Sequence, residues 1–253
     1  MHRFYLPPKE CQSVPLSLTG REAHHALHVL RLRPKEKVIV LDGAGSEFLC
    51  EAGEPERENV RLSVVQKNFF PPPTHQITLL QAIPKGKIIE SIIQKATELG
   101  AARIVPLISE RVASQLDDES AAMKVEKWRV VAIEAIKQCG AAWLPNVEAP
   151  MTPKAFLTRA EKFELPMIAS LQSDGRHPRK YFQSFYAEHQ RLPRSVCVWV
   201  GPEGDFTPAE MGAIKSAGAL PITLGRLVLR SETAAVYCLS VLNYELQYQC
   251  VTQ

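Results

Sequence analysis

Two glycine turns, each directly after a buried-strand pattern, constrain the fold of this chain more than any other feature. The apolar run 196–200 (VCVWV) leads straight into 201–204 (GPEG), and the run 220–224 (LPITL) leads into Gly225. Glycine lets a backbone turn sharply and approach a ligand closely. Because ligands of open α/β sheets bind outside the carboxyl ends of the strands, the two turns predict a binding pocket there.

A helix with a clear start follows the first turn. Thr207 is a favourable N-cap, Pro208 suits the first helical position, and Glu210 completes a capping box. Gly218 predicts the end of this helix. After the second turn, the spacing predicts a last helix over 232–248, so both turns lead towards a helix.

Strand and helix patterns alternate along the chain from residue 76 onwards. Strands are predicted at 77–83, 103–108, 166–171, 196–200 and 220–224, and the helices between them include 88–99 and 121–139. Such alternation predicts an α/β fold with a mainly parallel sheet covered by helices.

The first part of the chain reads differently and is rich in strand patterns. Strands are predicted at 37–41, 48–51 and 60–65, a short helix is predicted after Thr19-Gly20, and 54–58 is predicted to be an exposed acidic loop. Consecutive prolines in 70–74 (FPPPT) indicate a semi-rigid linker. We therefore predict a small domain over 1–73 and a larger one over 74–253.

Charge and cysteine usage limit the partners and the compartment. The formal net charge of +3 permits a nucleic-acid partner without requiring one. No apolar run approaches the roughly 20 residues of a membrane helix, and the N-terminus has no apolar signal core. The six cysteines are scattered without a CxxC pair, which is typical of reduced thiols in the cytoplasm.

Several common enzyme classes lack their motifs here. Lys85-Gly86-Lys87 has neither the spacing of a phosphate-binding loop nor the Ser/Thr after its lysine, which disfavours a nucleotide-phosphate hydrolase. The chain has no GxGxxG after its first strand, no GxSxG and no HExxH. His24 and His28 have helical spacing for a metal, but nothing nearby completes a ligand set, so no metal site is predicted.

Short motifs along the whole chain resemble one family of enzymes. They are 2–4 (HRF), 28–31 (HVLR), 95–100 (KATELG), 104–106 (IVP), 201–206 (GPEGDF), 224–225 (LG) and 229–234 (LRSETA). Together they resemble the SPOUT class of RNA methyltransferases and, within it, those that methylate N3 of a specific uridine in 16S rRNA. Two positions depart from that pattern. Asp205 stands where the family usually has a second glycine, and 140–142 (GAA) lacks the arginine that usually follows a pair like 138–139 (QC).

The resemblance implies an architecture, a cofactor and partners. It implies a parallel sheet with a deep trefoil knot in the C-terminal domain, which strand patterns do not reveal because knots are nearly absent from proteins. It implies an N-terminal PUA-like β-barrel domain that binds RNA. S-adenosyl-L-methionine is the implied methyl donor, the implied substrate is 16S rRNA in the 30S subunit, and the implied assembly is a homodimer, while the scattered cysteines predict a cytoplasmic location.

The candidate site residues follow from the turns and the head of the last helix. The predicted donor-binding residues are Leu171, Gly201, Pro202, Glu203, Gly204, Leu224, Gly225, Leu227, Leu229 and Thr233. The turns offer backbone groups to the edge of adenine, and the leucines offer apolar surface to its faces.

Arg230 and Glu232 are the predicted catalytic residues. Arg230 suits an anion on the uracil oxygens or a phosphate, and Glu232 suits a base or a partner that orients Arg230. Which residue takes the proton stays open. The alternative interpretation of this segment is helix capping, with Ser231 as N-cap and Glu232 favoured by the helix dipole.

Four basic residues of the first domain are predicted to contact RNA phosphates: Arg3, Arg21, Arg31 and Arg33. The alternative is a solvated charged face. Two other functions remain open, a non-catalytic RNA-binding or ribosome assembly factor of the same fold and a same-fold methyltransferase with another RNA target. The missing arginine in 140–142 favours the first of these, whereas the retained Arg230 and Glu232 argue against it.

Overall fold

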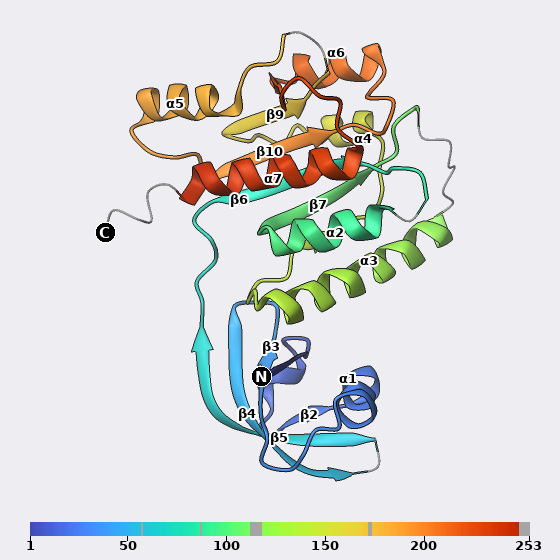
Figure 1. Ribbon diagram of the computed structural model, residues 1–253, viewed down its shortest axis with the longest axis vertical. Helices are drawn as coiled ribbons and strands as arrows, with labels where there is room; N and C mark the ends of the chain where they lie inside the picture. The colour runs from blue at the N-terminus through green and yellow to red at the C-terminus, as the bar shows by residue number, and fades with distance from the viewer. Residues whose placement is uncertain (57, 87, 112–117, 172–173, 248–253) are drawn as a thin grey trace. The chain divides into compact units, whose positions relative to one another are not determined.

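The computed structural model describes residues 1–56, 58–86, 88–111, 118–171 and 174–247 (Figure 1). The chain divides into two compact units. The first comprises Met1–Pro72 and Ile133–Leu144, and the second comprises Pro73–Ala132 and Pro145–Gln253. The first unit thus includes a segment, Ile133–Leu144, that lies far beyond the proline-rich linker in the sequence.

The described part of the first unit is built on a five-stranded sheet in the order β1-β3-β4-β5-β2. The strands are β1 (His2–Tyr5), β2 (Leu16–Leu18), β3 (Lys37–Leu41), β4 (Ser46–Glu56) and β5 (Asn59–Phe69). β1 and β3 are parallel, and the other neighbours are antiparallel. Alternate residues of these strands point inward. They form a core of Phe4, Leu16, Leu18, Val38, Val40 and Leu62.

The predicted short helix is confirmed as α1 (Gly20–His24), which continues as a π-helical turn at His25–Val29. A 3₁₀ turn, η1 (Glu10–Gln12), lies between β1 and β2. The prediction of an exposed loop over 54–58 is wrong for its first part, because β4 runs to Glu56 and pairs there with Asn59 of β5. The pairing of β4 with β5 shifts register between Ala52 and Pro55, and Arg57 lies outside the described residues.

The second unit contains a parallel sheet, with six strands among its described residues, in the order β11-β9-β10-β6-β7-β8. The strands are β6 (Gln76–Ala82), β7 (Ala101–Leu107), β8 (Asn146–Val147), β9 (Leu165–Ala169), β10 (Ser195–Val200) and β11 (Leu220–Ile222). The predicted parallel sheet is therefore confirmed. The short β8 was missed, because two residues carry no readable pattern.

Helices follow most of these strands and cover the sheet (Figure 1). They are α2 (Ile88–Glu98), α4 (Pro153–Thr158), α5 (Pro178–His189), α6 (Pro208–Ser216) and α7 (Ser231–Gln247). A further helix, α3 (Asp118–Cys139), follows β7, and its residues from Ile133 onwards belong to the first unit. The predicted end of the last helix at Tyr248 lies outside the described residues. None of the helices within the described ranges is both long enough and apolar enough to cross a membrane.

The two faces of the sheet are covered by different helices. α4 and α6 pack against one face of the sheet. There Leu80, Ile168 and Trp199 of the strands form a single apolar cluster with Phe156 of α4 and Ile214 of α6. α7 packs against β6, β10 and α2 (Figure 1). Since side chains alternate along a strand, the neighbours of Leu80 and Trp199 face α7. This arrangement places the head of α7 near the carboxyl ends of the central strands.

Candidate functional site

A cavity of about 300 Å³ opens at the carboxyl ends of β9 and β10, next to the segment between β11 and α7. Eight of the ten residues predicted to hold the donor line it: Leu171, Gly201, Pro202, Glu203, Leu224, Gly225, Leu227 and Leu229. The other lining residues include Ser170, Thr223, Arg226, Val228 and Ser231. The two glycine turns therefore converge on one cavity although β9 lies between β10 and β11, because parallel strands bring their carboxyl ends to one edge of the sheet.

Large apolar side chains stand exposed around this cavity. Leu171 is 61% exposed, Leu227 77% and Val228 76%. Several exposed apolar side chains gathered at one hollow indicate a binding surface rather than ordinary surface leucines. Since backbone amide and carbonyl groups from the turns line the same cavity, its chemistry suits a flat ligand with apolar faces and a polar edge.

The first glycine turn is tightly folded at Gly201. A Cβ atom at this position would lie 2.9 Å from Oδ1 of Asp205 and 3.2 Å from both the Asp205 Cα and the Phe206 nitrogen. The Asp205 amide donates to the Pro202 carbonyl over 2.9 Å, and its carboxylate accepts from the Phe206 amide over 2.8 Å. A side chain at 201 would therefore crowd the returning chain at Asp205 and Phe206, which favours glycine at this position.

Asp205 has φ +61°, which lies in the left-handed region. The resemblance expects glycine here, and glycine reaches that region without strain. Aspartate is one of the few other residues that tolerate it, because its short side chain bonds to the local backbone. The hydrogen bond from Phe206 is a bond of that kind. The departure at 205 is thus accommodated without opening the turn.

Gly204 and Thr233 lie apart from the other predicted donor-binding residues. Among the described residues, neither contributes to the lining of the cavity. The Gly204 carbonyl accepts a hydrogen bond from the guanidinium of Arg111, and a Cβ there would make only ordinary contact with that side chain. Thr233 is exposed and lines a different hollow together with Tyr237 and Tyr244.

The helix that follows the turn is held by the predicted capping box. The Thr207 hydroxyl accepts from the Glu210 amide over 3.2 Å, and the Glu210 carboxylate accepts from the Thr207 amide over 2.9 Å. The same buried carboxylate accepts from the Glu110 amide over 3.0 Å. Glu210 therefore fastens the loop after β7 to the start of α6, beside the glycine turn.

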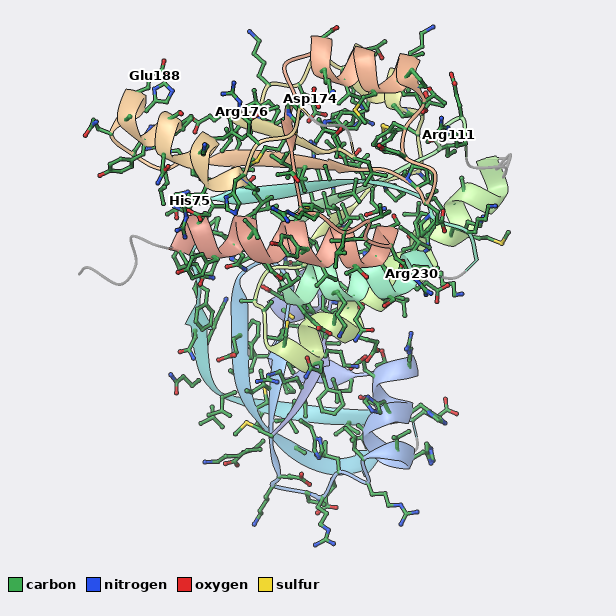
Figure 2. The ribbon with its side chains drawn as sticks, turned by 45° about the horizontal axis from the view of Figure 1, so that its top comes forward. His75, Arg111, Asp174, Arg176, Glu188 and Arg230 are labelled. Atoms are coloured by element: carbon green, nitrogen blue, oxygen red, sulfur yellow. The ribbon has the colours of Figure 1, made fainter. Side chains whose placement is uncertain are left out.

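The head of α7 carries the two predicted catalytic residues on either side of Ser231. Arg230 is exposed, and its carbonyl accepts the first helical hydrogen bond, from the Ala234 amide over 2.8 Å. Figure 2 shows Arg230 and Arg111 at the same end of the second unit, opposite His75, which precedes β6. An exposed guanidinium at that end is available to an anionic partner.

The interpretation of Ser231 as the N-cap is wrong. Arg230 occupies the position whose carbonyl begins the helix, while the Ser231 hydroxyl donates to the Gly201 carbonyl over 2.8 Å and accepts from Gln81 over 2.9 Å. Sequence reasoning also missed Gln81. Its signal was a single amide side chain near the end of a mostly apolar strand pattern, ITLLQAI.

Glu203 lies at the cavity with an exposed side chain. Its carboxylate accepts a hydrogen bond from the backbone amide of Lys85 over 3.2 Å. This contact joins the loop after β6 to the turn after β10. Glu203 therefore shapes the turn and also puts a negative charge at the edge of the cavity.

The four arginines predicted to contact RNA all lie in the first unit, in different surroundings. Arg3 is half-buried and donates to the carbonyls of Lys137 and Gln138 at the end of α3. Arg21 forms an ion pair with Glu134 over 3.2 Å. Arg31 and Arg33 have exposed side chains just after the π-helical turn. Arg3 is thus occupied by its hydrogen bonds to the end of α3. Arg31 and Arg33 are more available to a ligand than Arg3 is.

His24 and His28, whose spacing suits a metal ion, lie side by side in the first unit. The rings of His24 and His28 lie with centroids 4.8 Å apart. Within those residues no group of three or more His, Cys, Asp or Glu side chains is placed to hold a metal ion.

The chain is similar to known RNA methyltransferases over most of its length. Residues 71–243 match the model of an RNA methyltransferase domain, and residues 18–65 match that of an RNA methyltransferase PUA domain. A relative from Bacillus subtilis named ribosomal RNA small subunit methyltransferase E is 30% identical over 251 residues, covering 97% of each chain. Its namesake from Synechocystis sp. is 30% identical over 247 residues, covering 96% of this chain and 77% of the relative.

Solved structures agree with the sequence matches. A ribosomal RNA small subunit methyltransferase E from Neisseria gonorrhoeae bound to S-adenosyl methionine has a TM-score of 0.82 and 28% identity, covering 96% of each chain. A Legionella pneumophila protein solved with the bound cofactor SAM has a TM-score of 0.84 and 32% identity, again covering 96% of each chain.

Proposed function

The chain belongs to the ribosomal RNA small subunit methyltransferase E family, and we propose that it transfers a methyl group from S-adenosyl-L-methionine to N3 of a specific uridine in 16S rRNA. One observation carries this proposal. The cavity at the carboxyl ends of β9 and β10 combines exposed leucines with backbone groups, and the head of α7 presents Arg230 beside it.

The cavity fits the donor by the chemistry of its lining. Leu171, Leu227 and Leu229 supply apolar surface for the faces of an adenine, and the backbone of the 201–204 turn supplies hydrogen-bonding groups for its edge. The carboxylate of Glu203 favours a cation at the cavity edge. When bound, S-adenosyl-L-methionine supplies a methyl group activated by a sulfonium.

Arg230 and Glu232 prepare the acceptor base. N3 of uracil is weakly nucleophilic while it is protonated, so the site must remove that proton or stabilise the anion that results. The exposed guanidinium of Arg230 suits the uracil oxygens on which the negative charge develops, or the phosphate of the target nucleotide. Glu232 either takes the proton or orients Arg230.

In this proposal the first domain, assigned to 1–73, binds the RNA around the target uridine. N3 lies on the Watson–Crick edge of uracil, so the target must be unpaired or flipped out before it enters the site. Contacts to neighbouring phosphates must then support the reaction. Arg31 and Arg33, with their exposed side chains, are the best placed of the four predicted arginines, and Arg21 follows.

The same family membership supports proposals on assembly and location. We propose a homodimer that uses the exposed side of α7, where Tyr237 is 44% exposed and Tyr244 64%, next to a hollow of about 490 Å³. Exposed aromatic side chains in one patch favour a protein interface. We also propose that the catalytic domain, assigned to 74–253, contains a deep trefoil knot. The enzyme would work in the cytoplasm, where its 30S substrate is found.

The test is methyl transfer from labelled S-adenosyl-L-methionine to 30S subunits that lack the modification, with the product nucleoside identified by mass. Incorporation as 3-methyluridine is expected. Incorporation into a different nucleoside would reveal another RNA target. Absence of both incorporation and donor binding would instead favour a non-catalytic assembly factor.

A further inference from the structure

Gln81 is a polar side chain buried in the second unit, near the end of the central strand β6. It is 0% exposed. Its amide nitrogen donates to the Ala82 carbonyl over 2.8 Å and to the Ser231 hydroxyl oxygen over 2.9 Å. A carbonyl oxygen can only accept, so the atom that faces Ala82 must be the nitrogen, and both of its hydrogens are used.

Ser231 passes this contact on to the glycine turn. Its hydroxyl donates to the Gly201 carbonyl over 2.8 Å. Because a hydroxyl has a single hydrogen, its oxygen is left to accept from Gln81, so the directions of the two bonds agree. The chain from Gln81 through Ser231 to Gly201 therefore joins the end of β6, the head of α7 and the turn after β10.

The stability of the fold does not explain a glutamine at this position. The amide oxygen of Gln81 is buried and has no hydrogen-bond partner within the described part of the chain. A buried acceptor without a partner costs free energy, which an apolar side chain of similar shape would avoid. The gain from Gln81 must then lie in what its amide nitrogen holds in place.

We infer that Gln81 is a positioning residue for methyl transfer. Through Ser231 it fixes the head of α7 against the Gly201 turn, and Ser231 and Gly201 both line the cavity. Arg230 and Glu232 are the immediate neighbours of Ser231, so their side chains start from the point that Gln81 holds. Displacement of reacting groups by about 1 Å can slow a reaction by a factor of 10². This inference rests on the proposed function.

The sharpest variant is Gln81→Met, which keeps the length of the side chain and removes its donors while Ser231 can still bond to Gly201. Thr78→Val is the matched control, because Thr78 is a buried polar residue of the same strand that plays no part in the link. Ser231→Ala breaks the link from the other end, and Ser231→Thr retains the hydroxyl.

Two measurements separate positioning from a structural role. At saturating donor, kcat of Gln81→Met on 30S subunits is expected to fall at least about tenfold, with donor Kd within about twofold and an unchanged unfolding midpoint. Hydrogen exchange at the amides of 232–235, measured without RNA, is expected to quicken about tenfold. Thr78→Val should change neither, and Ser231→Thr should retain more activity than Ser231→Ala.

The outcomes distinguish this inference from the proposed function. A Gln81→Met enzyme with wild-type kcat and wild-type exchange at the head of α7 would overturn the inference. A loss of kcat fully matched by weaker donor binding or by unfolding would overturn it as well. If the wild-type protein fails to methylate 30S subunits, the proposed function falls, and the exchange measurement still decides whether Gln81 holds α7. If Gln81→Met does not fold, the contrast between the two Ser231 variants decides.

Discussion

Lys137 donates a hydrogen bond from its ammonium group to the carboxylate of Glu22 over 2.8 Å, although 115 positions separate the two residues. Both belong to the first unit. The side chain of Lys137 is 6% exposed and that of Glu22 14%. Glu134 lies 3.3 Å from the same ammonium, and Arg3 donates to the carbonyls of the last turn of α3. Buried charges thus hold the end of α3 to the first unit.

Lys137→Met is expected to lower the free energy of unfolding by about 3 kcal/mol, because it leaves the Glu22 carboxylate buried without its cation. Urea denaturation measures the change. Lys95→Ala is the matched control, since Lys95 pairs with Glu98 at an exposed position and should cost no more than about 0.5 kcal/mol. Equal losses for the two variants would contradict the assignment.

Arg230→Ala is expected to reduce methylation of 30S subunits at least about 100-fold, because a positioned cation at developing negative charge is worth that much. The free energy of unfolding should stay within about 0.5 kcal/mol of the wild-type value, since the side chain is exposed. Arg129→Ala removes an exposed arginine of α3 and serves as the control. Full turnover in Arg230→Ala would remove this residue from the mechanism.

Leu227→Ala is expected to weaken donor binding by roughly fivefold to tenfold, because it removes apolar surface that the ligand would cover. The unfolding midpoint should not fall, since Leu227 is already 77% exposed. Isothermal titration calorimetry with S-adenosyl-L-methionine gives the affinity. Val14→Ala, an exposed site in the first unit, should leave it unchanged.

Asp205 offers a test of backbone strain in the glycine turn. Asp205→Gly is expected to keep or raise the free energy of unfolding, because glycine adopts φ +61° freely. Asp205→Val is expected to lower it by about 2 kcal/mol or more. Thermal unfolding of the two variants compares them directly. Equal stabilities would mean that the turn relaxes to another conformation.

Acid should weaken the second unit through Glu164. Two hydrogen bonds from Arg191, both 2.8 Å, together with the Arg194 amide lower the pKa of this carboxyl from 4.5 to about 2. A carboxyl group whose pKa is lower in the folded state stabilises the fold at any pH above its unfolded-state pKa. The contribution of Glu164 is therefore lost as pH falls from 4.5 towards 2. The pair is partly exposed, so we expect no more than about 1 kcal/mol. Glu164→Gln should flatten the dependence of unfolding free energy on pH in this window, and an unchanged slope would count against the pair.

Local signals in the sequence predicted much of the second unit. The capping box of Thr207 and Glu210 is confirmed, and so is the helix end predicted from Gly218, because α6 ends at Ser216 and Gly218 has φ +101°. These features depend on residues a few positions apart, so the sequence pattern contains them. The convergence of the two glycine turns was predicted as well, because parallel strands bring their carboxyl ends to one edge.

Contacts between distant residues were beyond the reach of pattern reasoning. Nothing near Gln81 indicates that its partner is Ser231, 150 positions away. Ser231 itself looked like a helix cap, since serine favours that position, yet its hydroxyl turns to Gly201. Gly204 looked equivalent to Gly201, and the two differ because only Gly201 faces the returning Asp205.

The exposed leucines at the cavity edge connect the stability of the fold to the supply of methyl donor. A ligand that binds the folded chain and not the unfolded one raises the free energy of unfolding by about 2.7 kcal/mol at a concentration of 100 times its Kd. Leu171 and Leu227 provide apolar surface that such a ligand would cover. The enzyme should therefore be more resistant to proteolysis in cells rich in S-adenosyl-L-methionine than in starved cells, so that its abundance follows its cofactor.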